Sequence, residues 1–523
     1  MNIFSGASTI PSKKSLHSHT FLVLGRDRRT SYLSADNLDR ELDEQDAPDY
    51  IREYLAQIFR LRKPAKNHLP LLNFAIDRNI VFPGSAPGHF TLLPKGLAIC
   101  NAAEMLGRST FLSEFRGADL KVPTVFRAKT SALRVLTERF TEKSLNRMAR
   151  VILDDSSCSG LEDQHYLRYA GDPEVFHMLS GKTLNTSCLP FVFFSHGDTV
   201  RKDHELSGLI RTAGFYQPCH HIIADSEVFD DAYLKAHSTT VALMNTLFPS
   251  SHAFINIDVT QEFLDANGPL IGELAAIARQ PLVVKVTQRR VHYYSIQHQY
   301  MFMVSTGHFL QVGNLQLDFQ NAKEVSDAGD SSFDIGVVGA DGRRRAAVII
   351  HGVSTGRNFA ALTTILDLII RNRAEGIFPR IPLVLSPYHL RIFAVHDEAV
   401  SFCLEVARAC KISTRSVRAM IDDRPTTLSK KLYQSDRDWV RFQIVVGKQE
   451  IERGIVSLID RRAAEETVVS LALGPASVAE KICDIVYAAA MRESLSEQDF
   501  KILARCDPFA NIFRYSEIPT FLR

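Results

Sequence analysis

The feature that most constrains this chain is a change of texture near residue 376. Before about residue 350, short strand-like segments dominate, at 191–194, 208–221, 282–286, 302–304 and 315–319. After about residue 378, strand and helix patterns alternate, with strands expected at 381–385, 414–421 and 442–446 and a helix at 398–410. The two textures predict at least two domains of different architecture, with a boundary near 374–379.

Length and composition set the outer limits. A chain of 523 residues exceeds one ordinary core, so two or three domains are expected. The net charge of +2 excludes a wholly basic coat but leaves room for a local basic face. The eight cysteines form no CxxC pair, which argues against a disulfide framework and a zinc ribbon. No apolar run approaches the ~20 residues of a membrane helix, so no membrane association is expected.

The N-terminus leaves two readings open. The first 26 residues contain no acidic residue, several serines, Lys13, Lys14 and Arg26. A transit peptide has such a composition, and a loosely docked N-terminus is the alternative. Because arginine is scarce there, a cytoplasmic location is expected, with an organelle as the minor alternative.

Four segments are expected along the chain. Residues 1–68 form a short N-terminal extension that is partly helical, since apolar residues in 36–63 follow a helical spacing. Residues 69–375 form the first domain, with a long helix near 95–111 and an apolar helix at 356–373. Residues 376–495 form the second domain, and 496–523 a tail.

Several short motifs occur in a fixed order. They are Ala86-Pro87-Gly88; Thr199 to Asp203 (TVRKD); Gly208 to Gln217 (GLIRTAGFYQ); Gln311 to Phe319 (QVGNLQLDF); Val348 to Gly352 (VIIHG); Asp422 to Lys431 (DDRPTTLSKK); and Val445 to Glu450 (VVGKQE). Each motif alone is weak, but the order and the near-matching spacing are specific.

This ordered set resembles threonyl-tRNA synthetase over roughly residues 70–495. The resemblance implies an α+β protein: a class II synthetase catalytic domain, with an antiparallel β-sheet flanked by helices, and a C-terminal α/β anticodon-binding-like domain. It also implies ATP with Mg²⁺, threonine or a related small amino acid, and tRNA as ligands. A homodimer is expected, with the helix near 95–111 in its interface. Only about 65 residues precede the catalytic region, so no N-terminal editing module is expected.

Amino-acid activation joins a carboxylate to the α-phosphate of ATP, so an arginine fixed on a strand can neutralise the charge of the transition state. By resemblance, Arg201 is that arginine and Arg211 is a second phosphate contact. The resemblance also implies that the ring of Phe215 stacks on the adenine and that Asp203 lies near the adenine. Gln217 and Gln311 are likewise expected on the ATP-binding side. The alternative for a lone arginine on a strand is a surface ion pair.

Four candidate residues between 215 and 221 are spaced by two positions, and this spacing is an argument that does not depend on the resemblance. Phe215, Gln217, Cys219 and His221 would share one face of a continuous strand, where a plate, a polar contact and metal ligands can stand in a row. The alternative is a half-buried strand with an incidental histidine.

By resemblance, His221 and His351 are zinc ligands, and the zinc holds the substrate amino and hydroxyl groups. The third ligand of the family is a cysteine, and its position falls on Asp172; Cys219 is the alternative third ligand. Cys219 itself replaces a substrate-contacting aspartate, and Tyr294 and Gln316 fall on the remaining substrate positions.

Two positions depart from the family. The arginine nine residues after the motif histidine is Ala360 here, with Arg357 one turn earlier as a replacement. In the C-terminal domain, Arg424, Lys430, Lys431 and Glu450 are the expected tRNA contacts, but Ile459 stands where the family has an arginine. Two hypotheses follow: an active ligase, or a weakened or inactive paralogue that binds tRNA or amino acid or regulates a partner. A third possibility is an adenylating enzyme that loads a carrier protein or a small molecule.

Overall fold

Contacts divide the chain into two compact units. In this computed structural model, the described residues are 17–24, 29–62, 69–127, 148–152, 165–202, 206–248, 252–288, 293–323, 332–413, 415–493 and 512–523. The first unit comprises Met1–His68, Gly107–Asn245 and Pro249–Ala361, and the second Leu69–Leu106, Thr246–Phe248 and Leu362–Arg523. The boundaries expected after residues 68, 375 and 495 stay predictions. Among the helices described, none has the length and apolar character to cross a membrane.

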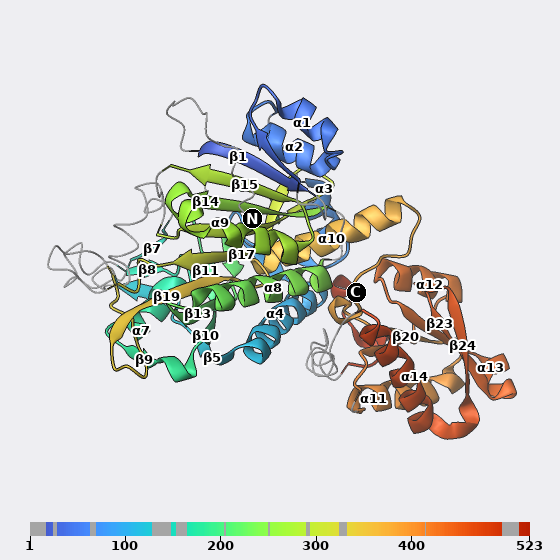
Figure 1. Ribbon diagram of the computed structural model, residues 1–523. Coiled ribbons are helices and arrows are strands. Elements are labelled where there is room, and N and C mark those ends of the chain that lie inside the picture. Colours follow the sequence, from blue (N-terminus) through green and yellow to red (C-terminus); the bar gives the residue numbers. More distant parts are fainter. Residues whose placement is uncertain are drawn as a thin grey trace. The chain divides into compact units, whose positions relative to one another are not determined.

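The first unit is built on one large, mostly antiparallel sheet (Figure 1). Its main path runs β2 (Arg29–Leu33), β1 (His17–Leu24), β15 (Leu282–Thr287), β14 (Ala253–Thr260), β16 (Ile296–Met303), β17 (Phe309–Asp318), β19 (Arg344–Val353), β13 (Cys219–Asp225), β10 (Phe191–His196) and β5 (Arg116–Lys121). Along this path only β14–β15 and β10–β5 are parallel. The mixed α+β architecture with an antiparallel-rich sheet confirms the predicted fold class.

The two faces of the sheet differ. His220 and His298 point to one face, where His220 stacks on Phe111 of α4 (Pro94–Glu114) with ring centroids 4.0 Å apart. On the same face, His298 Nε2 lies 3.0 Å from the hydroxyl of Tyr233 on α8 (Phe229–Leu247). Because side chains alternate along a strand, His221 and its cross-strand partners point to the opposite face. Figure 1 shows α8 and α9 (Gln261–Ala278) across the sheet.

The N-terminal segment is part of the large sheet. β1 pairs with β15 and β2 pairs with β1, both antiparallel. The helices α1 (Leu38–Glu44) and α2 (Asp49–Ile58) bury Leu42, Ile51 and Leu55 against this edge. The helical spacing predicted for 36–63 is therefore present, and its apolar side chains join the core of the first unit.

Smaller elements surround the large sheet. The strands β11 (Asp198–Val200) and β12 (Gly214–Tyr216) form a hairpin-like pair of their own, and β6 (Val125–Arg127), β8 (His165–Leu167) and β7 (Arg150–Val151) form another small sheet. The helix α7 (Asp172–Leu179) follows, with Pro173 in its first turn, where proline is well tolerated. At the edge, β9 (Thr183–Asn185) and β18 (Gly336–Val338) pair with each other, and β18 pairs with β19.

The second unit holds a five-stranded sheet in the order β21 (Ala419–Asp422), β20 (Leu390–Ala394), β22 (Phe442–Val446), β23 (Ile455–Asp460) and β24 (Glu465–Ser470). Its first three strands are parallel, and the last two are antiparallel. The helices α11 (Asp397–Ile412), α12 (Leu428–Arg437), α13 (Lys448–Arg453) and α14 (Gly474–Met491) accompany it. This unit also contains α3 (Leu69–Asp77), β3 (Val81–Pro83) and β4 (Phe90–Leu92).

One strand prediction in this region was wrong, and another began too early in the chain. The segment expected as a strand at 381–385 contains a 3-10 helix, Leu383–Leu385, because Pro382 lacks a backbone N–H and its φ of −52° starts a tight turn. The strand next to α11 is β20 instead. The strand expected at 414–421 is shorter and begins at Ala419. The apolar helix predicted at 356–373 is α10 (Asn358–Ala374).

Candidate functional site

Four adjacent strands place one row of side chains across the centre of the large sheet. Gln316 of β17 pairs with His351 of β19, His351 pairs with His221 of β13, and His221 pairs with Phe193 of β10. Residues that face each other across antiparallel strands point to the same side. Strand register alone therefore brings Gln316, His351 and His221 together on the face away from Phe111.

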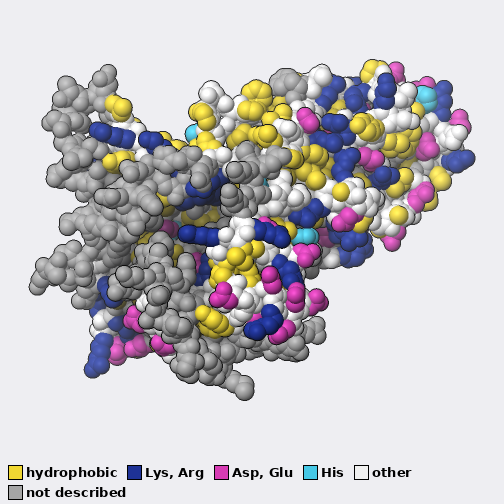
Figure 2. Space-filling view, turned by 90° about the horizontal axis from the view of Figure 1, so that it is seen from above, with side chains coloured by type: hydrophobic (Ala, Val, Ile, Leu, Met, Phe, Trp, Pro, Cys, Tyr) yellow, Lys and Arg dark blue, Asp and Glu magenta, His cyan; other side chains and the backbone are white. Residues whose placement is uncertain are grey.

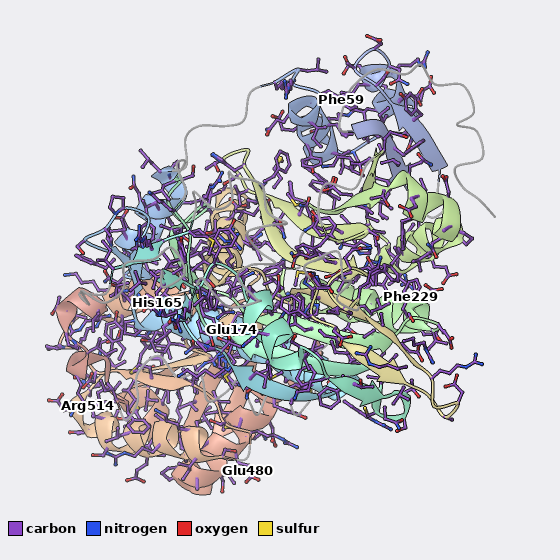
Figure 3. All side chains as sticks on the ribbon, turned by 90° about the vertical axis from the view of Figure 1, so that its left-hand side faces the viewer. Phe59, His165, Glu174, Phe229, Glu480 and Arg514 are labelled. Atoms are coloured by element: carbon purple, nitrogen blue, oxygen red, sulfur yellow. The ribbon has the colours of Figure 1, made fainter. Side chains whose placement is uncertain are left out.

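Asp172 meets this row from the first turn of α7. Its Oδ1 lies 2.9 Å from Nε2 of His221 and 3.5 Å from Nδ1 of His351. The two imidazole rings are parallel, with centroids 6.0 Å apart, and Phe176 of α7 meets both edge-on. Figure 3 labels Glu174 on the same helix, two residues after Asp172.

Charge within this group is strongly coupled. Burial opposes ionisation of Asp172, but His351 and His221 outweigh it and hold the pKa of that carboxyl well below its usual range. Burial lowers the pKa of His221, and the hydrogen bond that its imidazole donates to Asp172 opposes the shift. For His351, burial is outweighed by Asp172 and the fully buried Asp318, so its pKa is raised. The group combines one carboxylate with two imidazoles that it orients.

The donor set fits a metal ion. One ligand atom from each of Asp172, His221 and His351 can lie within 4.8 Å of the others. One carboxylate oxygen and two imidazole nitrogens are donors that Zn²⁺ accepts, with a fourth position left for a substrate. Among the residues described, this group contains Asp172 and not Cys219, whose Sγ instead lies 3.9 Å from the carbonyl oxygen of Gln217.

Tyr293 also contacts the group, although sequence reasoning selected its neighbour Tyr294. The ring of Tyr293 stacks on His351 at 5.4 Å, and its hydroxyl lies 3.4 Å from Asp172 Oδ2 and 3.2 Å from Gln316 Oε1. The ring of Tyr294 meets that of Tyr293 edge-on at 5.6 Å. Two adjacent tyrosines carry no periodic signal, so the sequence offered no means of choosing between them.

A second cluster lies around Phe215 of β12. The ring of Phe215 is 4% exposed, and the guanidinium of Arg357 lies 4.1 Å from its centroid. Arg201 lies 5.4 Å from the same centroid and 4.6 Å from that of Tyr169. Nε of Arg201 also donates to the carbonyl oxygen of Tyr169 at 3.1 Å. The guanidinium groups of Arg201 and Arg357 thus both lie close to the ring of Phe215.

The start of α10 explains why Arg357 reaches Phe215. Asn358 Oδ1 accepts a hydrogen bond from the backbone N–H of Tyr216 at 3.1 Å, which ties β12 to the helix start. Arg357 precedes Asn358 and lies beside the neighbouring Phe215. Ala360 is only 7% exposed and lies in the apolar core. The cation near the plate is therefore Arg357, three residues before the position that the family pattern selects.

Other predicted residues on the ATP side are more scattered. Arg211 forms an isolated bridge with Ser207, before β12. Gln217 is buried, and its N–H donates to the carbonyl oxygen of Gly197 at 3.2 Å. Gln311 is exposed on β17. Asp203 lies outside the described residues.

The predicted single row from Phe215 to His221 was wrong in one respect. Phe215 lies on β12, which pairs with β11, whereas Cys219 and His221 lie on β13 in the large sheet. Gln217 and Pro218 separate the two strands, and Pro218 cannot donate a ladder hydrogen bond. Phe215 and the two histidines of the candidate metal group are thus held by different sheets within the first unit.

In the second unit, most residues predicted to bind tRNA have partners within the protein. Lys431 is 3% exposed, and its Nζ donates to the carbonyl oxygens of Ala394 and Asp422 at 2.6 and 3.1 Å. Arg424 forms a two-pronged pair with Asp422, at 2.8 and 2.6 Å. The guanidinium of Arg424 also lies 4.5 Å from the ring centroid of Tyr515 in the C-terminal segment.

Glu450 has a structural task as well, whereas Lys430 is exposed. Oε2 of Glu450 accepts a hydrogen bond from the N–H of Gly447 at 2.9 Å, at the start of α13. This contact satisfies a backbone donor that the helix itself leaves open. The expectation that Lys431 presents its charge to RNA is not met, because the structure uses that charge to join β20 and β21.

Comparison with known proteins supports the division into two parts. A model described as "Anticodon binding domain" matches residues 389–481. The chain is 26% identical over 445 residues to a threonine–tRNA ligase of Thermococcus gammatolerans, covering 82% of this chain and 67% of the relative. It is 26% identical over 419 residues to the corresponding ligase of Thermococcus kodakarensis, covering 79% of this chain and 62% of the relative. The chain thus spans about two thirds of the length of these curated relatives.

A solved structure matches the fold. The crystal structure titled as the RNA binding domain of threonyl-tRNA synthetase from Cryptosporidium parvum Iowa II superimposes with a TM-score of 0.63 at 17% identity, covering 80% of this chain and 98% of that one. Together with the antiparallel-rich sheet, this likeness gives the fold of a class II aminoacyl-tRNA synthetase with an anticodon-binding domain. Among proteins of that fold, the chain resembles threonyl-tRNA synthetases.

Proposed function

We propose that the protein activates threonine or a related small amino acid with ATP and transfers it to tRNA. The observation that carries the proposal is the convergence of Arg201 and Arg357 on Phe215. Activation builds negative charge where the amino-acid carboxylate meets the α-phosphate, and two fixed guanidinium groups stabilise such charge. The relatives named threonine–tRNA ligase give independent support.

The residues of the first unit have separate proposed roles in binding ATP. Phe215 offers an apolar plate for the adenine ring, next to Arg357. Arg201, held by the carbonyl of Tyr169, neutralises phosphate and carboxylate oxygens. Arg211, Asp203, Gln217 and Gln311 complete the ATP side of this proposal. ATP would bind with Mg²⁺, which would supply further positive charge to its phosphates.

The amino acid binds over the Asp172, His221 and His351 group. These residues would hold a zinc ion, which supplies a Lewis acid for the amino and hydroxyl groups of a β-hydroxy amino acid. The hydroxyl of Tyr293 lies within hydrogen-bond distance of Asp172 Oδ2 and of Gln316 Oε1 on β17, so Tyr293 helps to hold both side chains in place. Cys219 and Tyr294 belong to the same proposed pocket. An open zinc position would distinguish threonine from valine, which lacks the hydroxyl.

The finer expectations belong to the same proposal. We place the protein in the cytoplasm as a homodimer that uses α4 in its interface, and sedimentation of the purified chain tests the dimer. The second unit contacts chiefly the phosphate backbone of tRNA, because Ile459 on β23 offers no hydrogen-bond donor to a base edge. Lys430 is the exposed cation among its predicted contacts.

A paralogue without catalysis is the second candidate. Ala360 favours it, because the family position of the second cation carries no charge here. Such a protein would still bind tRNA or an amino acid.

Amino-acid-dependent ATP–pyrophosphate exchange, run with all twenty amino acids, decides between the candidates. An active ligase gives exchange with threonine or one related small amino acid. No exchange with any amino acid, in a preparation that contains stoichiometric zinc, would establish the second candidate.

A further inference from the structure

Three arginines of the second unit converge without any carboxylate partner. Arg78 follows α3, Arg373 lies in the last turn of α10, and Arg437 ends α12. Among the described residues, none of the three forms a salt bridge with an acidic side chain. Figure 2 shows Lys and Arg side chains interspersed with Asp and Glu over the face it draws.

Backbone contacts hold two of these arginines side by side. Nη2 of Arg437 donates to the carbonyl oxygen of Asp77 at 3.1 Å, and Nη1 of Arg78 reaches the carbonyl oxygen of Arg437 at 3.5 Å. Beneath them, Phe74 and Trp439 stack with centroids 6.1 Å apart, and Arg78 lies 5.0 Å from the centroid of Phe74. Two like charges are thus fixed by packing, although they repel each other.

Arg373 adds to the same electrostatic field. Partial burial, with Arg437 and Arg373 nearby, lowers the pKa of Arg78 to about 10. Two carboxylates of this unit are engaged elsewhere: Asp438 is buried between Lys95 and Arg391, and Asp436 faces Arg461 at 3.2 Å. Among the described residues, the three arginines have no ion-pair partner.

An exposed aromatic ring lies beside the cations. Tyr433 of α12 is 62% exposed, and the guanidinium of Arg437 lies 5.9 Å from its centroid. Guanidinium groups bind phosphate oxygens with two parallel N–H donors, and an exposed ring next to them can stack on a sugar or a base.

We infer that Arg78, Arg373, Arg437 and Tyr433 form a binding surface for the phosphate backbone of tRNA. This inference rests on the proposed function and adds a location for RNA contact outside the Asp422–Lys431 stretch. It also explains how the second unit can bind RNA when Arg424 and Lys431 are engaged within the protein. The surface recognises the charge of the tRNA phosphates and does not distinguish base sequences, because phosphate contacts carry no base information.

The test compares the wild-type chain with Arg373→Gln, which removes an exposed cation at the end of α10. The dissociation constant for tRNA is expected to rise roughly three- to tenfold at low salt, and the log–log salt slope to become shallower by about one unit. The charge reversal Arg373→Glu should weaken binding further. ATP–pyrophosphate exchange, which needs no tRNA, should remain at the wild-type rate.

Arg492→Gln is the matched control, because Arg492 is an exposed arginine at the end of α14 in the same unit. It should leave tRNA affinity within about twofold of wild type. If Arg373→Gln and Arg373→Glu bind tRNA like Arg492→Gln, the inference is overturned while the proposed function stands. A rise in the KM for ATP with unchanged tRNA affinity would assign the surface to free nucleotide and also overturn it. A wild type without tRNA binding would contradict the proposed function itself.

Discussion

The two units use their charged side chains in opposite ways. In the first, Asp172, His221 and His351 come from α7, β13 and β19 and converge within hydrogen-bond or ion-pair distance. In the second, Lys431 and Arg424, which the sequence marks as RNA contacts, turn to carbonyls and to Asp422. Strand register is therefore a better guide to which side chains lie together than a motif on a loop or helix is.

Removing a central ligand of the first unit should give the largest effect. His221→Ala is expected to lose stoichiometric zinc and to lower kcat/KM for the amino acid by roughly a hundredfold or more, since even indirect partners of metal ligands cost about 10–100-fold. Metal analysis of chelator-washed protein and exchange kinetics measure both. Cys219→Ala is the control for zinc content, because Cys219 lies on the same strand and outside the group of candidate ligands. Zinc retained at one per chain in a His221/His351 double variant would contradict the site.

Lys431→Met tests the opposite use of charge in the second unit. It leaves the carbonyls of Ala394 and Asp422 without their donor, so the free energy of unfolding should fall by about 1–3 kcal/mol. Denaturant titration measures this, and tRNA affinity should stay near wild type while the unit is folded. Lys430→Met, at the exposed neighbour, should show the reverse pattern. Weakened RNA binding by Lys431→Met without loss of stability would restore the original prediction.

The smallest effect is expected at the start of α13. Glu450→Ala removes the acceptor for the N–H of Gly447 and should lower the free energy of unfolding by about 0.5–1 kcal/mol. Glu450→Gln keeps an acceptor oxygen and should recover most of that loss. A large, anticodon-specific fall in tRNA affinity in Glu450→Ala would show that the carboxylate reads a base.

The sequence predicted most of the fold, and it selected the three residues that the structure brings together at Asp172, for identifiable reasons. The strands β10, β15 and β22 are rich in β-branched and aromatic residues, and the helices α4, α10 and α11 have lengths and apolar spacing that distinguish them from strands. His221 and His351 were found by motif, and Asp172 by counting back from Leu189-Pro190. These residues lie on regular elements or in a first helical turn, where sequence distance translates directly into position.

The remainder could not be predicted because it depends on contacts between distant segments. The break between β12 and β13 depends on which strand each one pairs with. The role of Tyr293 depends on the end of a loop that reaches Asp172, and that of Lys431 on the spacing of β20 and β21. Spacing along the sequence contains none of this information.

The central claim is that Arg357 supplies the second positive charge beside Phe215. In the family pattern, an arginine at the position of Ala360 has this role. The most direct measurement is ATP–pyrophosphate exchange by Arg357→Ala beside wild type and Arg357→Lys. With the guanidinium 4.1 Å from the Phe215 centroid, the account predicts a roughly 10²- to 10³-fold fall in kcat for Arg357→Ala, with partial recovery by lysine and unchanged zinc content. Robust exchange that is indifferent to Arg357→Ala would contradict the claim.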